Sequence, residues 1–140
     1  HFEYAPVGDI VNTNQRIEAL NKQLGTKILA SRETIDGVNG IFSRDLGAFL
    51  LGGKTNPVTV HELISAERLS SEEHRLYFEL FPKAMNCFRR GQWSVAFDLF
   101  HECIDLHEHD GPSIFFLGLS HSFQKKPPKG EWKGVIRVSK

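Results

Sequence analysis

Asn12 and Arg16 stand four residues apart and are the side chains in this chain best suited to chemistry on an anion. In a helix, that spacing puts both on one face, one turn apart. Asn12 can donate and accept hydrogen bonds, and Arg16 is a permanent planar cation that suits phosphate. With the free amides of a helix N-terminus they predict an anion site, although spacing alone is more typical of a solvated helix face.

One amphipathic helix from Gly8 to Gly25 must position this pair. Asp9 is suited to accept hydrogen bonds from the free amides of the first turn, and Gly25 stands where a C-terminal glycine ends a helix. Apolar residues recur at helical spacing and predict one buried stripe, formed by Val11, Ile17, Leu20 and Leu24. Asn12 and Arg16 lie off this stripe, so the helix can pack while their face stays available.

The segment around this helix resembles the second half of the class III nucleotidyl cyclase catalytic domain. The resemblance lies in GDIVNTNQRIEALNKQLG, then TKILAS, then FSRDLGAFLLGGKTNPVTVHELI, which follow the family's order and spacing. It covers residues 1–64. It implies an α+β fold, the C-terminal half of a ferredoxin-like cyclase core, which another half must complete.

The resemblance also implies roles for individual residues. In the family, the residue matching Asn12 orients the ribose, and the residue matching Arg16 stabilises the triphosphate while the 3′-oxygen attacks the α-phosphate. Gly8 and Asp9 fall in the turn that binds the substrate. Two Mg²⁺ or Mn²⁺ ions bind aspartates in the first half of the domain, so no metal ligand is assigned here. The implied assembly is a head-to-tail homodimer, or a pairing with the first half, in which each site is shared.

The chain departs from the family pattern at two substrate positions. The residue that selects the purine is usually Asp or Thr, but here it is Ala5, which offers no hydrogen bond to a base. The phosphate-holding lysine of the family falls at Gly52, and Lys54 is the candidate replacement. One hypothesis is therefore that the chain is part of a signalling cyclase that makes cyclic AMP or cyclic GMP from ATP or GTP. On this hypothesis the fragment alone is inactive. The alternative is a degenerate cyclase-like module for dimerisation or regulation.

Strand and helix patterns alternate irregularly through the first 64 residues, which is typical of an α+β fold. Strand-like stretches cover residues 1–7, 26–30, 41–53 and 57–64. The stretch from residue 41 is expected to split at Gly47 into two pieces. Ser31 is expected to start a short helix.

From Ser65 onward helical patterns replace strands, so residues 65–140 form a second predicted unit, a helical C-terminal extension. Helices are expected over 71–90, 93–107 and 110–124, with a short strand near the end of the chain. Pro82 predicts a kink or a break in the first of them, and Leu76 and Val95 are expected to contribute to the apolar faces.

A helix, a glycine turn and a helix in this extension resemble one tetratricopeptide-type repeat. The extension also resembles the helical tail that follows the cyclase domain in some bacterial members of the family. Two interpretations stay open: a separate protein-interaction unit, or a helical part whose aromatic face packs on the cyclase half.

Two other motifs are rejected as sites. The sequence GGKT over 52–55 lacks the glycine that a P-loop needs at position 48, where Ala48 stands. The stretch HECIDLHEH over 101–109 lacks the second histidine of a zinc-binding HExxH motif, because Asp105 replaces it. Surface histidines at a helix end are the better interpretation.

The charge balance argues against a polyanionic partner. The chain has 17 basic and 17 acidic residues, so no net field favours nucleic acid or an anionic membrane. No apolar run approaches the roughly 20 residues that a membrane span needs. The two cysteines, Cys87 and Cys103, are expected to be reduced. These features favour a cytoplasmic location for this part, with any membrane anchor of the parent protein upstream.

Overall fold

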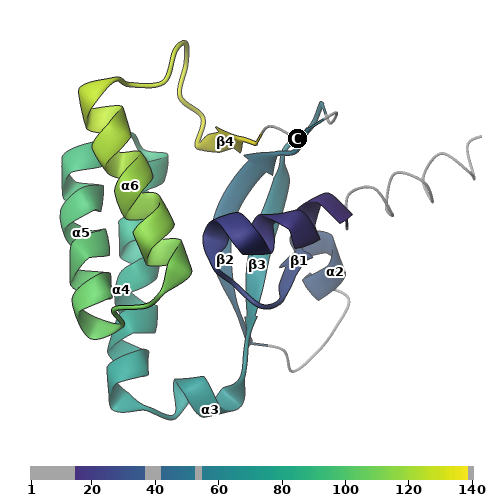
Figure 1. Ribbon diagram of the computed structural model, residues 1–140, viewed down its shortest axis with the longest axis vertical. Coiled ribbons are helices and arrows are strands. Elements are labelled where there is room, and N and C mark those ends of the chain that lie inside the picture. Colours follow the sequence, from purple (N-terminus) through teal and green to yellow (C-terminus); the bar gives the residue numbers. More distant parts are fainter. Residues whose placement is uncertain (1–14, 37–41, 53–54, 139–140) are drawn as a thin grey trace, which may run out of the picture.

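A four-stranded mixed sheet stands beside a group of three long helices (Figure 1). The computed structural model describes residues 15–36, 42–52 and 55–138. The strand order is β1-β3-β2-β4, in which β1 and β2 run antiparallel to β3, and β4 runs parallel to β2. The strands are β1 Leu29–Ser31, β2 Phe42–Leu50, β3 Val58–Ile64 and β4 Val135–Arg137. The α+β class expected from the sequence is confirmed.

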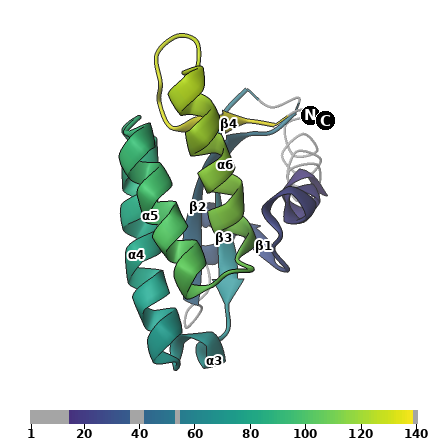
Figure 2. The same cartoon turned by 60° about the vertical axis from the view of Figure 1, so that its left-hand side comes forward.

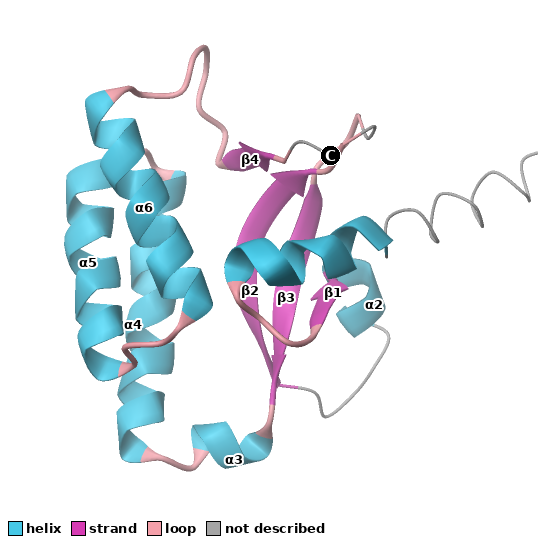
Figure 3. Cartoon of the chain, in the orientation of Figure 1, coloured by secondary structure: helices cyan, strands magenta, loops and turns pink. Residues whose placement is uncertain are grey.

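The long helices α4, α5 and α6 lie side by side as antiparallel neighbours, and the turned view shows the same grouping (Figure 2). A further helix over residues 15–24 lies on the other side of α6, and a short one follows β1 (Figure 3). The remaining bounds are α2 Arg32–Asp36, α3 Ala66–Leu69, α4 Glu72–Arg89, α5 Trp93–Leu106 and α6 Gly111–Lys125.

Several of the local signals in the first 64 residues are confirmed. The strand expected over 57–64 is β3, and the Ser31 hydroxyl accepts a hydrogen bond from the Thr34 amide at 3.3 Å at the start of α2. The strand expected over 26–30 begins later, at Leu29, because Thr26 is bonded back to the preceding helix. Its hydroxyl donates to Asn21 Oδ1 at 2.7 Å. The strand expected over 1–7 lies outside the described residues.

The split expected at Gly47 in the stretch over 41–53 is wrong, because β2 is one strand with a bulge. Asp45 pairs with His61 and Ala48 pairs with Thr59, so β2 holds one residue more than its partner. Gly47 has a φ of +101°, a backbone conformation that side chains disfavour. The extra residue changes which positions point inward, and it keeps Leu46 and Phe49 on the same buried face.

Of the kink or break predicted at Pro82, the break is wrong, because α4 continues through the proline as one helix. Pro82 lies on the exposed side of the helix, where the carbonyl that loses its amide partner can be hydrated. Leu76 and Val95 were expected on the apolar faces of their helices. They are instead about half exposed (48% and 50%). The buried stripe of α4 runs through Tyr77, Phe81, Ala84, Met85 and Phe88.

One hydrophobic core draws on both sides of residue 64. Ile17 and Leu20 come from the first helix, Phe49 from the sheet, and Phe100 and Phe116 from the long helices. The chain then returns from α6 to the sheet through a loop that Trp132 holds in place. Trp132 Nε1 donates a hydrogen bond to the Phe88 backbone carbonyl at 3.2 Å. The aromatic face of the helical part therefore packs against the sheet half of the molecule.

Candidate functional site

The helix over residues 15–24 places Arg16 beside a firmly packed stripe. Ile17, Leu20 and Leu24 are at most 2% exposed, which confirms the described part of the predicted stripe. Arg16 is half-buried on one flank of that stripe. The other predicted site residues, Ala5, Gly8, Asp9, Asn12 and Lys54, lie outside the described residues. The structure thus locates the helix that carries Arg16, and the other predicted site residues stay a prediction.

Gly52 lies in the turn that directly follows β2, and the end of this strand is held on both sides. Phe49 pairs with Val58 of β3 and with Ile136 of β4. The Val138 amide then donates to the Leu50 carbonyl at 3.1 Å. The segment leading to Lys54 therefore starts from a fixed strand end, and the last strand of the helical part supplies half of that support.

A shallow depression of about 370 Å³ opens between the first helix and β1. Its walls are Ile17, Glu18, Asn21, Lys27, Ile28, Leu29, Ala30 and Thr34. Helical spacing puts Glu18 and Asn21 on the flank of the buried stripe opposite to Arg16. Arg16 is not among the residues that line this depression.

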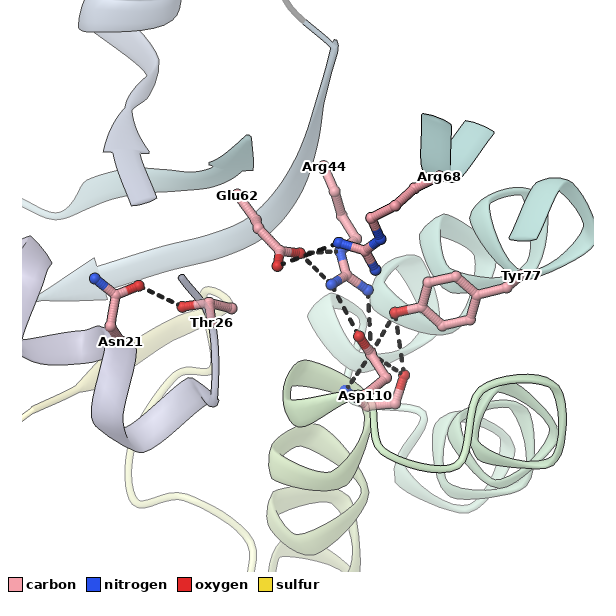
Figure 4. A network of polar contacts seen from close by, with 8 residues as sticks. Asn21, Thr26, Arg44, Glu62, Arg68, Tyr77 and Asp110 are labelled. Atoms are coloured by element: carbon pink, nitrogen blue, oxygen red, sulfur yellow. Dashed lines mark hydrogen bonds and ion pairs between the residues drawn. The ribbon is translucent and has the colours of Figure 1, made fainter. Parts of the chain in front are cut away.

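A buried polar network joins the sheet to the long helices, and sequence reasoning missed it. Arg44 of β2 lies between Glu62 of β3 and Asp110, the residue that caps α6 (Figure 4). Arg44 Nε donates to Glu62 at 2.9 Å, while its two terminal nitrogens donate to Asp110 at 3.1 and 3.0 Å. Arg44, Glu62 and Asp110 are each less than 8% exposed.

Asp110 collects more hydrogen bonds than any other buried carboxylate in the described part of the chain. Besides Arg44, it accepts from the Tyr77 hydroxyl, the Ser113 amide at 3.0 Å and the Ser113 hydroxyl at 2.7 Å. The Arg44 guanidinium carbon lies 4.6 Å from the centre of the Phe81 ring and 5.1 Å from that of Tyr77. The expected helix start at Asp110 is confirmed, and the same side chain also anchors the helix to the sheet.

Charge and donors are balanced within this network. Arg68 approaches Glu62 at 3.7 Å from the solvent side, so two guanidinium groups face two carboxylates. Buried charges are tolerated when they are paired and hydrogen-bonded in this way. The arrangement fixes positions rather than presenting a reactive group. One sequence signal does point to it, because Glu62 shares the face of Val58 and Val60 in the alternation along β3.

Two other titratable side chains are buried nearby. Burial raises the pKa of the Cys103 thiol to about 12, and the negative charge of Asp110 adds to this effect. Burial also lowers the pKa of His61, whose Nδ1 lies 3.4 Å from the Ser43 hydroxyl. The environment of Cys103 is not that of a reactive thiol, because an activated thiol needs a lowered pKa. Both cysteines are free thiols.

Across the residues that the structure describes, no three His, Cys, Asp or Glu side chains gather in a way that could hold a metal ion. In the HECIDLHEH stretch, His101 lies 3.6 Å from Asp105 on the exposed side of α5. Over the same described ranges, no helix combines the length and the apolar character needed to cross a bilayer.

The chain is similar to an adenylate cyclase. It is 24% identical over 123 residues to the terminal-differentiation specific adenylate cyclase of Dictyostelium discoideum. The match covers 83% of this chain but 6% of that protein, so the chain spans a small part of its relative's length. No protein-family model matches the chain, and no solved structure does. The bacterial source expected from the helical extension gains no support from this relative.

The match to this relative must include part of the helical extension over residues 65–140. Residues 1–64 could not supply 83% of the chain alone, and neither could residues 65–140. The similarity therefore includes residues on both sides of the expected boundary. The division into a part over 1–64 and a part over 65–140 stays a prediction, as does the tetratricopeptide-like character of the second part.

Proposed function

We propose that this chain is the C-terminal part of a class III nucleotidyl cyclase catalytic domain together with a helical extension. The complete protein would convert ATP or GTP to the cyclic 3′,5′-monophosphate and pyrophosphate in signal transduction. The observation that carries the proposal is the similarity to the Dictyostelium adenylate cyclase, which runs through both parts of the chain. It agrees with the motif resemblance around Asn12 and Arg16.

In this proposal Arg16 stabilises the triphosphate and Asn12 orients the ribose, with Gly8 and Asp9 in the substrate-binding turn. Phosphoryl chemistry is catalysed mainly by positioning and by charge stabilisation. A guanidinium on a helix whose stripe is almost completely buried is suited to that task, because its backbone is fixed before the substrate arrives. Lys54 would add a second cation at the turn after β2.

The metal ions of the reaction are proposed to bind upstream of this chain. The described residues offer no fitting cluster of ligands, and the resemblance assigns the aspartates to the first half of the catalytic domain. When bound there, Mg²⁺ or Mn²⁺ would polarise the triphosphate. The site would then be shared between this part of one chain and the first half from a head-to-tail homodimer partner, within the cytoplasm, where the nucleotides are found.

The test is cyclase turnover by the chain extended upstream through the complete catalytic domain, with ATP or GTP and Mn²⁺. Replacing Arg16 by Ala is expected to lower kcat by about 100-fold or more, the usual effect of removing one charge-stabilising donor. Arg75→Ala is the matched control, because Arg75 is an exposed arginine of α4 (62%), far from any predicted site residue in sequence. The 140-residue chain alone is expected to be inactive.

A folded extended chain without turnover on either nucleotide would contradict the proposal. That result would favour the alternative of a degenerate module for dimerisation or regulation, in which Ala5 and Gly52 have replaced functional side chains. If turnover is found, the preferred nucleotide identifies the purine, which Ala5 itself does not select.

A further inference from the structure

The N-terminal end of α6 packs backbone to backbone against the end of the helix that carries Arg16. A side-chain carbon built on Gly111 would lie 2.7 Å from Gly25 Cα and 2.9 Å from the Gly25 carbonyl oxygen, and it would also meet the Leu24 carbonyl. A carbon built on Gly25 would lie 3.1 Å from Gly111 Cα. No larger residue fits at Gly111 unless one of the two helices moves.

The α6 side of this contact is fixed to the sheet. Asp110, the residue before Gly111, is 4% exposed and is bonded through both carboxylate oxygens to Arg44 of β2. The same carboxylate accepts from Tyr77 of α4 and from the Ser113 amide inside α6. Any strain at Gly111 is therefore relieved by movement of the first helix rather than of α6.

The first helix transmits such a movement to Arg16. Arg16 precedes Gly25 by nine residues, which is about 13 Å along a helix axis. Ile17, Leu20 and Leu24 keep the helix packed along its length, so it shifts or tilts as one body. A displacement of about 1 Å at a charge-stabilising group is enough to cost roughly 100-fold in rate.

We propose that the corner formed by Asp110 and Gly111 is a positioning element for Arg16. The helical extension would then set the location of the helix that carries the triphosphate-binding arginine, instead of serving as a separate interaction unit. The effect on turnover rests on the proposed function, whereas the positioning of the helix does not.

The first part of the test uses hydrogen exchange, which reports on the packing of the first helix and needs no enzymatic activity. Gly111→Ala in the extended chain is expected to lower hydrogen-exchange protection of residues 15–24 by about tenfold, with little change in β3. Gly118→Ala is the matched control in the same helix, since a side-chain carbon there meets nothing within 4 Å. Unchanged protection over 15–24 in Gly111→Ala, or an equal loss throughout the molecule, would overturn the proposal.

A milder variant covers the case in which Gly111→Ala fails to fold. Ser113→Ala removes one hydroxyl donor to Asp110 and leaves Gly111 intact. It is expected to lower protection over 15–24 more than protection over β3. Equal changes in the two segments would count against the proposal.

The second arm measures turnover. Gly111→Ala is expected to lower kcat at least tenfold with a smaller change in KM, because the contact acts on a group that stabilises the transition state. In an Arg16→Ala background the same change is expected to have no further effect, since residues that act through one group are not additive. An additive loss would contradict positioning through Arg16. An inactive wild-type chain would refute the proposed function and leave the exchange arm to decide the positioning.

Discussion

Arg44 and Asp110, 66 residues apart in sequence, form a two-point ion pair in the interior of the molecule. One belongs to β2, an inner strand of the sheet, and the other caps the last long helix. Because Asp110 also accepts from Tyr77 and Ser113, the pair joins the sheet, α4 and α6 at one place. The pair therefore helps to hold the two halves of the chain together, alongside the shared core and the β2–β4 pairing.

Removing Asp110 is expected to destabilise the protein strongly. Asp110→Ala leaves the Arg44 guanidinium, 4% exposed, without one of its two carboxylates, and breaking a buried pair in this way typically costs about 3–5 kcal/mol. Urea unfolding followed by circular dichroism measures the change. Glu72→Ala is the control, because Glu72 and Arg75 pair on the surface, where such a pair contributes about 0–1 kcal/mol. A loss below 1 kcal/mol for Asp110→Ala would show that the network is not an anchor.

Gly47→Ala is expected to destabilise the bulge of β2. A side chain at a φ of +101° is strained, and its carbon would lie 3.3 Å from Met85 Cε. Strain of this kind costs about 1–3 kcal/mol. Gly118→Ala is again the control, since Gly118 is an exposed position inside α6, where alanine stabilises a helix by up to about 1 kcal/mol relative to glycine. Thermal unfolding of both variants is the measurement, and a Gly47→Ala protein as stable as the wild type would contradict the prediction.

His61 is expected to make the protein less stable in mild acid. Burial lowers its pKa below the ordinary value of 6.5, with the charges of Arg32 and Arg89 adding to the effect and those of Asp45 and Asp36 opposing it. As the pH falls through 6.5, the unfolded chain binds a proton at His61 while the folded chain does not. The stability present above about pH 6.5 is therefore lost as the pH falls further.

The measurement for His61 is urea unfolding of the wild type and of His61→Gln between pH 8 and pH 5. Other groups titrate in both proteins, so the difference between the two stability curves reports His61 alone. The wild type is expected to lose more stability than the variant on acidification. Parallel curves would mean that His61 has the same proton affinity in the folded and unfolded states.

The two thiols are expected to differ in reactivity. Cys103 is completely buried with its pKa raised to about 12, while Cys87 is partly accessible on α4. Because the thiolate is the nucleophile, iodoacetamide at pH 8 is expected to label Cys87 and to spare Cys103 until the protein unfolds. Mass spectrometry of the labelled peptides decides this. Rapid labelling of Cys103 under native conditions would contradict the burial seen here.

The sequence was most informative where a signal is local. Asp110 followed by Gly-Pro predicted the start of α6, and the spacing of Ile17, Leu20 and Leu24 predicted a buried stripe. Capping and helical periodicity depend on residues within a few positions of one another, so no partner needs to be known. Spacing pointed to Asn12 and Arg16, but the roles of the site residues were reached by resemblance, and of those residues Arg16 alone falls within the described part of the chain.

Predictions failed where a distant segment decides the outcome. Gly47 was expected to separate two strands, but pairing with β3 holds β2 together across the bulge. Pro82 was expected to kink or break a helix that packing on α5 and the sheet keeps unbroken. In both cases tertiary contacts outweigh a local preference of a few kcal/mol.

By itself, the sequence determined the α+β class, the helical second part and the apolar stripe beside Arg16, because each follows from short-range pattern. Tertiary structure alone decided that Arg44, Glu62 and Asp110 share one buried network and that Gly111 meets Gly25. Those contacts join residues far apart in the chain, and ion pairing and close backbone packing leave no periodic trace in a sequence. The position of the Arg16 helix is therefore set by residues that lie outside the motif carrying it.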